Sequence, residues 1–279
     1  MTVRITLCFL VLVACGCRSI SSIRTTETQP GNRGYFVGGP GSAKPNTLTR
    51  VEAERARDEG VTLFAQQPRS LERAALAASK LETAAQVLTG DFNVQVNAAQ
   101  AWAFVAENEA QADTRRNAAK RGIVAARRAR ELEPSRVEGH YWYAVNIGFL
   151  ADVDRSYGLS AVAEMEPALR RAGEIDARYD YAGPLRVLGV LLLRTPAPPV
   201  SIGSPRKGLR LLQRAVERFP DYPENYIYLG EALCENDRVE EACGAWRKSL
   251  ALPAPADRQF ESRRWQQNTS KLLAAKSGK

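Results

Sequence analysis

The stretch YIYLGEALCENDRVEEACGAWRKSLALP, residues 226–253, decides the fold class of this 279-residue chain. Apolar and small residues recur three and four positions apart on both sides of Asn236-Asp237, which predicts two amphipathic helices joined by a tight turn. Gly230 and Ala242 are small where two antiparallel helices would cross. Larger side chains are expected to fill the layer between neighbouring hairpins: Tyr226, Leu233 and Trp246.

The same pattern occurs once more upstream. Leu185-x₂-Leu188-Gly189-x₂-Leu192 precedes Gly208-x₃-Leu212, Ala215 and Pro220. Both hairpins have the Leu-Gly pair of the first tetratricopeptide (TPR) helix, and Ala242-x₃-Trp246 of the last hairpin also has the Ala-x₃-aromatic spacing of the second. Gly189 and Gly230 are 41 residues apart, which is one 34-residue repeat plus a Pro-rich insertion of seven. The residues predicted to pack the repeats are Leu188, Gly189, Ala215, Tyr226, Leu229, Gly230, Ala242 and Trp246.

The remainder of the chain from residue 47 has the same helical periodicity, and no sustained period-two stretch indicates a strand. Helices are expected at 48–66, 70–88, 93–108, 112–132, 136–152, 158–176, 184–194, 205–218, 223–235, 239–251 and 256–275. This predicts an all-α fold, an α-solenoid of four to five TPR-like hairpins over residues 47–279; a four-helix bundle with extra helices is the alternative.

The terminal helix is expected to cap the solenoid. In that arrangement Phe260, Trp265 and Leu272 or Leu273 face the last hairpin, and basic side chains face outward: Arg258, Arg263, Arg264 and Lys271. Such a cap would cover apolar surface on the last repeat that would otherwise be exposed to water.

The N-terminus predicts export. Residues 1–14 combine Arg4 with an apolar run, and Leu12-Val13-Ala14-Cys15 resembles the lipobox of bacterial lipoproteins, which implies lipidation of Cys15. A plain secretory signal or an uncleaved anchor is the alternative. Residues 15–46 are rich in Ser, Thr, Gly, Pro and Asn and are expected to be a flexible tether. The expected location is the cell envelope, lipid-anchored and facing the periplasm, with Gly16 favouring the outer membrane.

Composition argues against several function classes. The formal net charge of +8 is spread along the chain, and for an envelope protein it indicates a solvated basic face, not nucleic-acid binding. With one histidine, His140, and few cysteines, metal sites and catalytic Cys-His pairs are not expected, and no phosphate loop or nucleophile elbow occurs. We therefore expect no enzyme activity, no metal and no cofactor. Cys234 and Cys243 are expected to be thiols, with a disulfide as the alternative.

A binding groove is expected on the concave side, which the first helices of such hairpins line. In repeat register these helices carry a mixture of apolar, aromatic and a few charged residues that suits a partner peptide or a hydrophobic ligand. The expected groove residues are Tyr141, Val145, Arg186, Val190, Leu193, Arg194, Ile227 and Glu231. For each one, a role in packing between repeats is the alternative. The Pro-rich loop 195–205 is expected to be a stiff flap at the mouth of this groove.

Residues 135–250 resemble the T-component of TRAP transporters, a family of TPR-type periplasmic lipoproteins. The resemblance rests on Tyr141-Trp-Tyr-Ala144, Tyr181-Ala-Gly-Pro-Leu-Arg-Val-Leu-Gly189, the loop 195–205 and Pro223-Glu-Asn-Tyr226. It implies a hydrophobic cleft, assembly as a homotrimer and docking of a periplasmic solute-binding protein. A TPR adaptor in outer-membrane or pilus assembly, gripping another envelope protein, is the competing interpretation.

Overall fold

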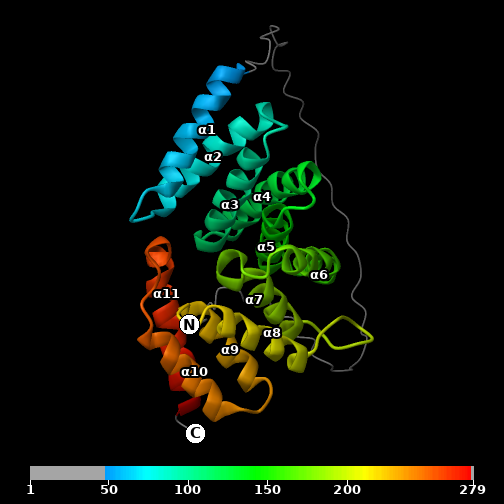
Figure 1. Ribbon diagram of the computed structural model, residues 1–279, viewed down its shortest axis with the longest axis vertical. Coiled ribbons are helices and arrows are strands. Elements are labelled where there is room, and N and C mark those ends of the chain that lie inside the picture. Colours follow the sequence, from blue (N-terminus) through cyan, green and yellow to red (C-terminus); the bar gives the residue numbers. More distant parts are fainter. Residues whose placement is uncertain (1–47, 278–279) are drawn as a thin grey trace, which may run out of the picture.

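The computed structural model describes residues 48–277, so the predicted signal, Cys15 and the tether lie outside the described residues. Within this range the chain forms eleven α-helices and two short 3₁₀ turns (Figure 1). The helices are α1 (Arg50–Ala65), α2 (Leu71–Val87), α3 (Phe92–Asn108), α4 (Ala112–Leu132), α5 (Val137–Val153), α6 (Gly158–Ile175), α7 (Tyr179–Arg194), α8 (Pro205–Arg218), α9 (Pro223–Cys234), α10 (Val239–Ala251) and α11 (Gln259–Ser277).

The all-α prediction is confirmed, and so is the division into hairpins. Consecutive helices pack in antiparallel pairs, α1 with α2 through α9 with α10, which makes five hairpins followed by α11. Short polar side chains start the first three helices: Thr49 forms a capping box with Glu52, and Ser70 and Asp91 accept hydrogen bonds from the first turns of α2 and α3. No helix in residues 48–277 is long and apolar enough to cross a bilayer.

Small residues permit the close helix crossings that the repeat pattern predicts. A Cβ atom on Gly189 of α7 would lie 3.2 Å from the carbonyl oxygen of Gly208 on α8, and one on Gly208 would lie 2.8 Å from that of Gly189. At the next hairpin Gly230 lies against the side chain of Trp246, not against another backbone. The indole of Trp246 donates a hydrogen bond to the carbonyl of Ile227 at 3.1 Å.

The other predicted packing residues lie at or near helix interfaces. Leu188, Ala215, Ala242 and Trp246 are buried, whereas Tyr226 and Leu229 are half-buried and pack against the same cluster as Trp246. His140 has a structural contact: its Nε2 lies 2.9 Å from the carbonyl of Pro134 and ties α5 to the preceding turn. Cys234 and Cys243 are free thiols.

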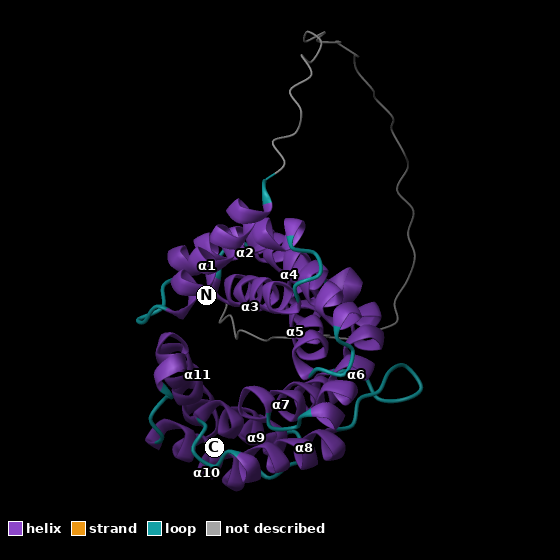
Figure 2. Cartoon of the chain, turned by 45° about the horizontal axis from the view of Figure 1, so that its top comes forward, coloured by secondary structure: helices purple, strands orange, loops and turns teal. Residues whose placement is uncertain are grey.

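Helix α11 caps the last hairpin and also closes the superhelix. Trp265 and Leu272 pack against α9 as expected. The prediction for Phe260, however, is wrong: its ring lies 5.1 Å from that of Phe104 on α3. The prediction that Arg258 and Arg264 face outward is also wrong, because Arg258 pairs with Asp180 and Arg264 pairs with Glu107. The helices therefore follow a ring that returns to its start, with the beginning of α11 beside the turn between α1 and α2 (Figure 2).

Candidate binding cavity

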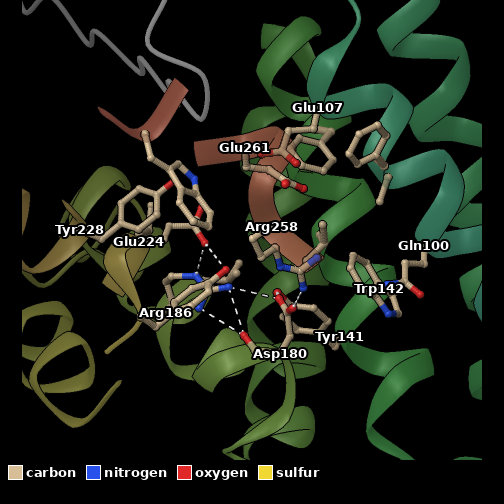
Figure 3. A pocket seen from close by; sticks show the side chains of 18 of the residues that line it. Gln100, Glu107, Tyr141, Trp142, Asp180, Arg186, Glu224, Tyr228, Arg258 and Glu261 are labelled. Atoms are coloured by element: carbon tan, nitrogen blue, oxygen red, sulfur yellow. Dashed lines mark hydrogen bonds and ion pairs between the residues drawn. The ribbon is translucent and has the colours of Figure 1, made fainter. Parts of the chain in front are cut away.

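The ring surrounds a central cavity of about 100 Å³. The first helices of the hairpins supply its wall, together with residues of the α1–α2 turn and of α11 (Figure 3). Apolar and aromatic side chains make up most of this wall: Phe64, Phe104, Trp142, Val145, Phe149, Val187, Val190 and Trp265. A second compartment of about 270 Å³ adjoins it, and the two share Glu107, Glu224, Tyr228 and Trp265.

Six of the eight predicted groove residues line one of these spaces. Tyr141, Val145, Arg186 and Val190 line the central cavity, and Ile227 and Glu231 line the second compartment. Leu193 and Arg194 line neither space: Leu193 packs over Gly208 of α8, and Arg194 forms an ion pair with Glu231 at 2.5 Å. The loop 195–204 lines neither space; Val200 is exposed, and Ile202 packs on the outside of the core.

Arg186 is the centre of a buried ionic network in the cavity wall. Its guanidinium lies 3.2 Å from the carboxylate of Asp180 and 3.2 Å from that of Glu224, and it donates to Asn225 Oδ1 at 3.1 Å. Burial by itself would lower the pKa of Arg186, but the neighbouring acidic groups, Glu224 first, outweigh it and raise the pKa. Arg186 is thus a fixed charge that holds α7 to α9.

A left-handed turn at the start of α7 positions Asp180. Asp180, Tyr181 and Ala182 have φ angles of 48°, 55° and 65°, a conformation that residues other than glycine seldom adopt. Hydrogen bonds from two buried side chains stabilise this turn. Arg186 donates to the carbonyls of Asp180 and Tyr181, and Asn225 Nδ2 donates to the Tyr181 carbonyl at 3.2 Å. The predicted break at Tyr179-Asp180 corresponds to this turn.

Three side chains contact the Asp180 carboxylate. Tyr141 donates a hydrogen bond to it, Arg258 pairs with its other oxygen, and Arg186 contacts it from α7 (Figure 3). Burial, reinforced by Asp180, raises the pKa of Tyr141 well above its ordinary value, so the phenol remains a proton-bearing donor. This cluster joins α5, α7 and the segment before α11, and it forms a polar part of the cavity wall.

The start of α11 meets the α1–α2 turn and α3 at a boundary that we call the seam. A longer ion pair lies in this seam. Arg69 and Glu261 lie 3.8 Å apart, with side chains only 9% and 7% exposed. The Arg69 guanidinium lies 4.6 Å from the centre of the Phe64 ring and 5.1 Å from that of Phe104. Arg69 Nε and Glu261 Oε2 are buried without a hydrogen-bond partner. Burial, and then Glu107, raise the pKa of Glu261 to about 6.

Most of this ionic lining was not predicted from the sequence. Arg69, Glu107, Asp180, Glu224, Arg258 and Glu261 were not among the predicted groove residues, because charged residues on amphipathic helices are ordinarily placed on the solvated face. Asp180 had one available signal, its position beside a predicted helix break. Within the described residues no cluster of His, Cys, Asp or Glu is arranged to hold a metal ion. The arrangement suits binding: fixed charges, aromatic faces and side chains with unpaired polar atoms line a partly open space.

No protein-family model matches this sequence, and no curated protein matches it. Solved structures do. A thermophilic TPR protein of Thermus thermophilus matches with a TM-score of 0.57 at 17% identity, covering 80% of this chain and 99% of that one. PilF of Pseudomonas aeruginosa matches with a TM-score of 0.50 at 14% identity, covering 80% of this chain and 92% of that one. The fold of this chain is therefore that of a TPR-type α-solenoid.

Proposed function

We propose that the protein is a non-enzymatic binding scaffold of the cell envelope, which is anchored by a lipid on Cys15 and takes a ligand or a partner segment into its central cavity. The observation that carries the proposal is the ring itself. A superhelix closed by α11 surrounds a partly open space lined by aromatic and apolar side chains, with buried ionic groups at fixed positions. Enclosed, mostly apolar space with a few convergent polar groups is the usual form of a ligand site.

Within this scaffold class we favour a protein associated with a TRAP transporter, docking a periplasmic solute-binding protein, and facing the periplasm from the outer membrane as a homotrimer. The support is the resemblance of residues 135–250 to the T-component, together with the Leu-x-Ala-Cys sequence that ends at Cys15. Here the solute-binding protein delivers or receives the ligand, and the lipid holds the scaffold beside the membrane.

Cavity occupancy is tested with a pair of tryptophan variants of the full-length chain. Val145 lines the cavity on α5, so Val145→Trp fills it, whereas Val124 is 67% exposed on α4, so Val124→Trp adds the same side chain on the outside. Each protein is extracted from its own membranes and examined by native mass spectrometry. We expect a bound mass on the unmodified protein and on Val124→Trp, and its loss from Val145→Trp with unchanged circular dichroism. A bound mass that survives in Val145→Trp contradicts an interior site.

The partner is tested by affinity capture from solubilised membranes followed by protein identification. Recovery of a solute-binding protein supports the TRAP-type role. Recovery of a pilus or outer-membrane assembly subunit instead overturns that role and supports the adaptor function. Labelled palmitate tests the anchor, since Cys15→Ala should abolish its incorporation and leave an unprocessed precursor.

A further inference from the structure

Two side chains that line the cavity each have one buried polar atom without a hydrogen-bond partner. Of the buried side-chain nitrogen and oxygen atoms without a hydrogen bond in residues 48–277, those that line the cavity are Arg69 Nε and Glu261 Oε2. A buried donor or acceptor left unpaired is destabilising, so a ligand group that pairs with it gains binding free energy. One is a donor and the other an acceptor, and their side chains are 3.8 Å apart.

The other charged groups of the cavity already have protein partners. Asp180 is held by Tyr141, Arg186 and Arg258. Glu224 lies 3.2 Å from Arg186 and accepts a hydrogen bond from Tyr222 at 3.3 Å. Glu107 pairs with Arg264. Among the charged groups of the central cavity, Arg69 and Glu261, on opposite sides of the seam, therefore form the pair with the longest contact.

The net charge of the lining restricts what can be bound there. The two compartments together are lined by five carboxylates and five cations: Glu107, Asp180, Glu224, Glu231 and Glu261, with Arg69, Arg186, Arg258, Arg264 and Lys271. Each of these carboxylates already lies beside an arginine, Glu231 beside Arg194 and the others beside arginines of the lining. A ligand with a net charge would therefore add a charge without a counterion, which is unfavourable in a buried site. A zwitterion adds no net charge and can give an ammonium to Glu261 and a carboxylate to Arg69.

The space also sets the size and character of the rest of the ligand. A cavity of about 150 Å³ lined by apolar side chains holds benzene, and the compartments here are about 100 Å³ and 270 Å³. Beyond the seam, apolar side chains such as Val145, Val190, Ile227 and Leu272 line the walls. A branched or aromatic side chain of amino-acid size fits this description.

We propose that the seam is a clamp for a free α-amino acid with an apolar side chain, in which Glu261 accepts from the ammonium group and Arg69 donates to the carboxylate. The inference rests on the proposed binding function and adds the ligand class and the two residues that recognise it. Since Arg69 belongs to the α1–α2 turn and Glu261 to α11, the bound molecule bridges the two ends of the ring.

The test is isothermal titration calorimetry of the full-length protein with L-valine, L-leucine and L-phenylalanine, and with two leucine analogues that each lack one charged group, isocaproate and isoamylamine. We expect L-leucine to bind, and each of its two deletion analogues to bind at least about tenfold more weakly, as loss of a charge-assisted hydrogen bond implies. Analogues that bind as well as leucine does would overturn the clamp. So would the absence of binding by all three amino acids.

Two pairs of variants separate recognition from folding. Glu261→Gln and Arg69→Met remove the clamp, and Glu82→Gln and Arg121→Met make the same changes in an ion pair of α2 and α4 that does not line the cavity. Binding should weaken about tenfold or more in the first pair only. Equal loss in both pairs contradicts the assignment. If no amino acid binds but Val145→Trp still loses a co-purified apolar molecule, the clamp is wrong and the scaffold function stands; if neither holds, both are wrong.

Discussion

Arg264 on α11 donates a hydrogen bond to Asn108 Oδ1 on α3 at 2.5 Å, and the two residues lie 156 positions apart in the sequence. The same guanidinium pairs with Glu107. Within residues 48–277, no Cα atom of α11 comes within 8 Å of one in α1, α2 or α3. The closure of the ring between these helices is therefore made by long side chains reaching across a gap, chiefly Arg264, Glu107, Phe104 and Phe260.

Arg264→Ala should loosen this closure. It leaves the Glu107 carboxylate, 22% exposed, without its counterion, and we expect a loss of about 1–3 kcal/mol in the free energy of unfolding. Hydrogen exchange should quicken in α11 before it quickens in α5. The control is Arg121→Ala, which breaks the more exposed pair with Glu82 and should cost less than about 1 kcal/mol. Equal losses of unfolding free energy in the two variants would mean that the Arg264 contacts stabilise the fold no more than an exposed ion pair does.

Gly230→Ala should destabilise the last hairpin. The added Cβ would lie 2.3 Å from Nε1 of the Trp246 indole, so the indole must move and strain its hydrogen bond to Ile227. Overpacking of this kind costs about 1–3 kcal/mol. Gly244→Ala on the facing helix is a matched control because nothing lies within 4 Å of its added Cβ, and the helix propensity of alanine should leave it neutral or more stable. Urea unfolding distinguishes the two.

Asn225→Ala should destabilise the left-handed turn at the start of α7. The Asn225 side chain is fully buried and donates to the carbonyls of Tyr181 and Ala215 while accepting from Arg186. Its removal leaves buried polar groups unpaired, with an expected cost of about 2–4 kcal/mol. Urea unfolding measures the cost, and near-ultraviolet circular dichroism should report a changed environment of Tyr181 and Tyr222, whose rings stack at 4.3 Å. An unchanged near-ultraviolet spectrum would contradict the role given to Asn225.

Glu261 should make the ligand-free protein less stable as pH rises. Burial and Glu107 raise its pKa from 4.5 to about 6, and Arg258 and Arg69 only partly offset them. The folded state then binds more protons than the unfolded state between these two values, so stability contributed by the protonated form is lost as pH rises from 4.5 to about 6.

Glu261→Gln should remove this dependence and stabilise the protein above pH 6 by about 1–2 kcal/mol, because the amide mimics the protonated acid. Thermal melts across the window, compared with those of Glu82→Gln, check the expectation. Higher stability combined with weaker amino-acid binding is the joint result that the clamp predicts. A variant that melts lower at neutral pH would show that the Glu261 charge stabilises the fold.

The helices were predictable because each depends on local information. Periodicity and Pro or Gly breaks placed 205–218 within the bounds of α8, where Pro205 occupies the first turn. The burial of Gly189 and Gly230 followed from the same repeat pattern. At α7 the sequence located a break but not its form, because three successive left-handed residues are stabilised by Arg186 and Asn225 from elsewhere in the fold.

The cavity was only partly predictable. Tyr141, Val145, Arg186 and Val190 follow from repeat register, because first helices face inward in any such superhelix. The closure does not follow, because it depends on curvature summed over five hairpins, and no local pattern encodes whether α11 meets α3. For that reason Phe260, Arg258 and Arg264 were predicted to face the wrong way, and the pair of Arg69 with Glu261 was not foreseen.

The central claim is that the superhelix closes into a ring around a binding cavity, and a distance across the seam tests it most directly. Spin labels at Val61 on α1 and Gln266 on α11, both exposed, are placed in a chain whose native cysteines are replaced by serine, and double electron–electron resonance measures their separation. We predict one narrow distance distribution that broadens or lengthens in Arg264→Ala. A broad or long distribution in the unmodified protein, insensitive to Arg264→Ala, would contradict the closed ring.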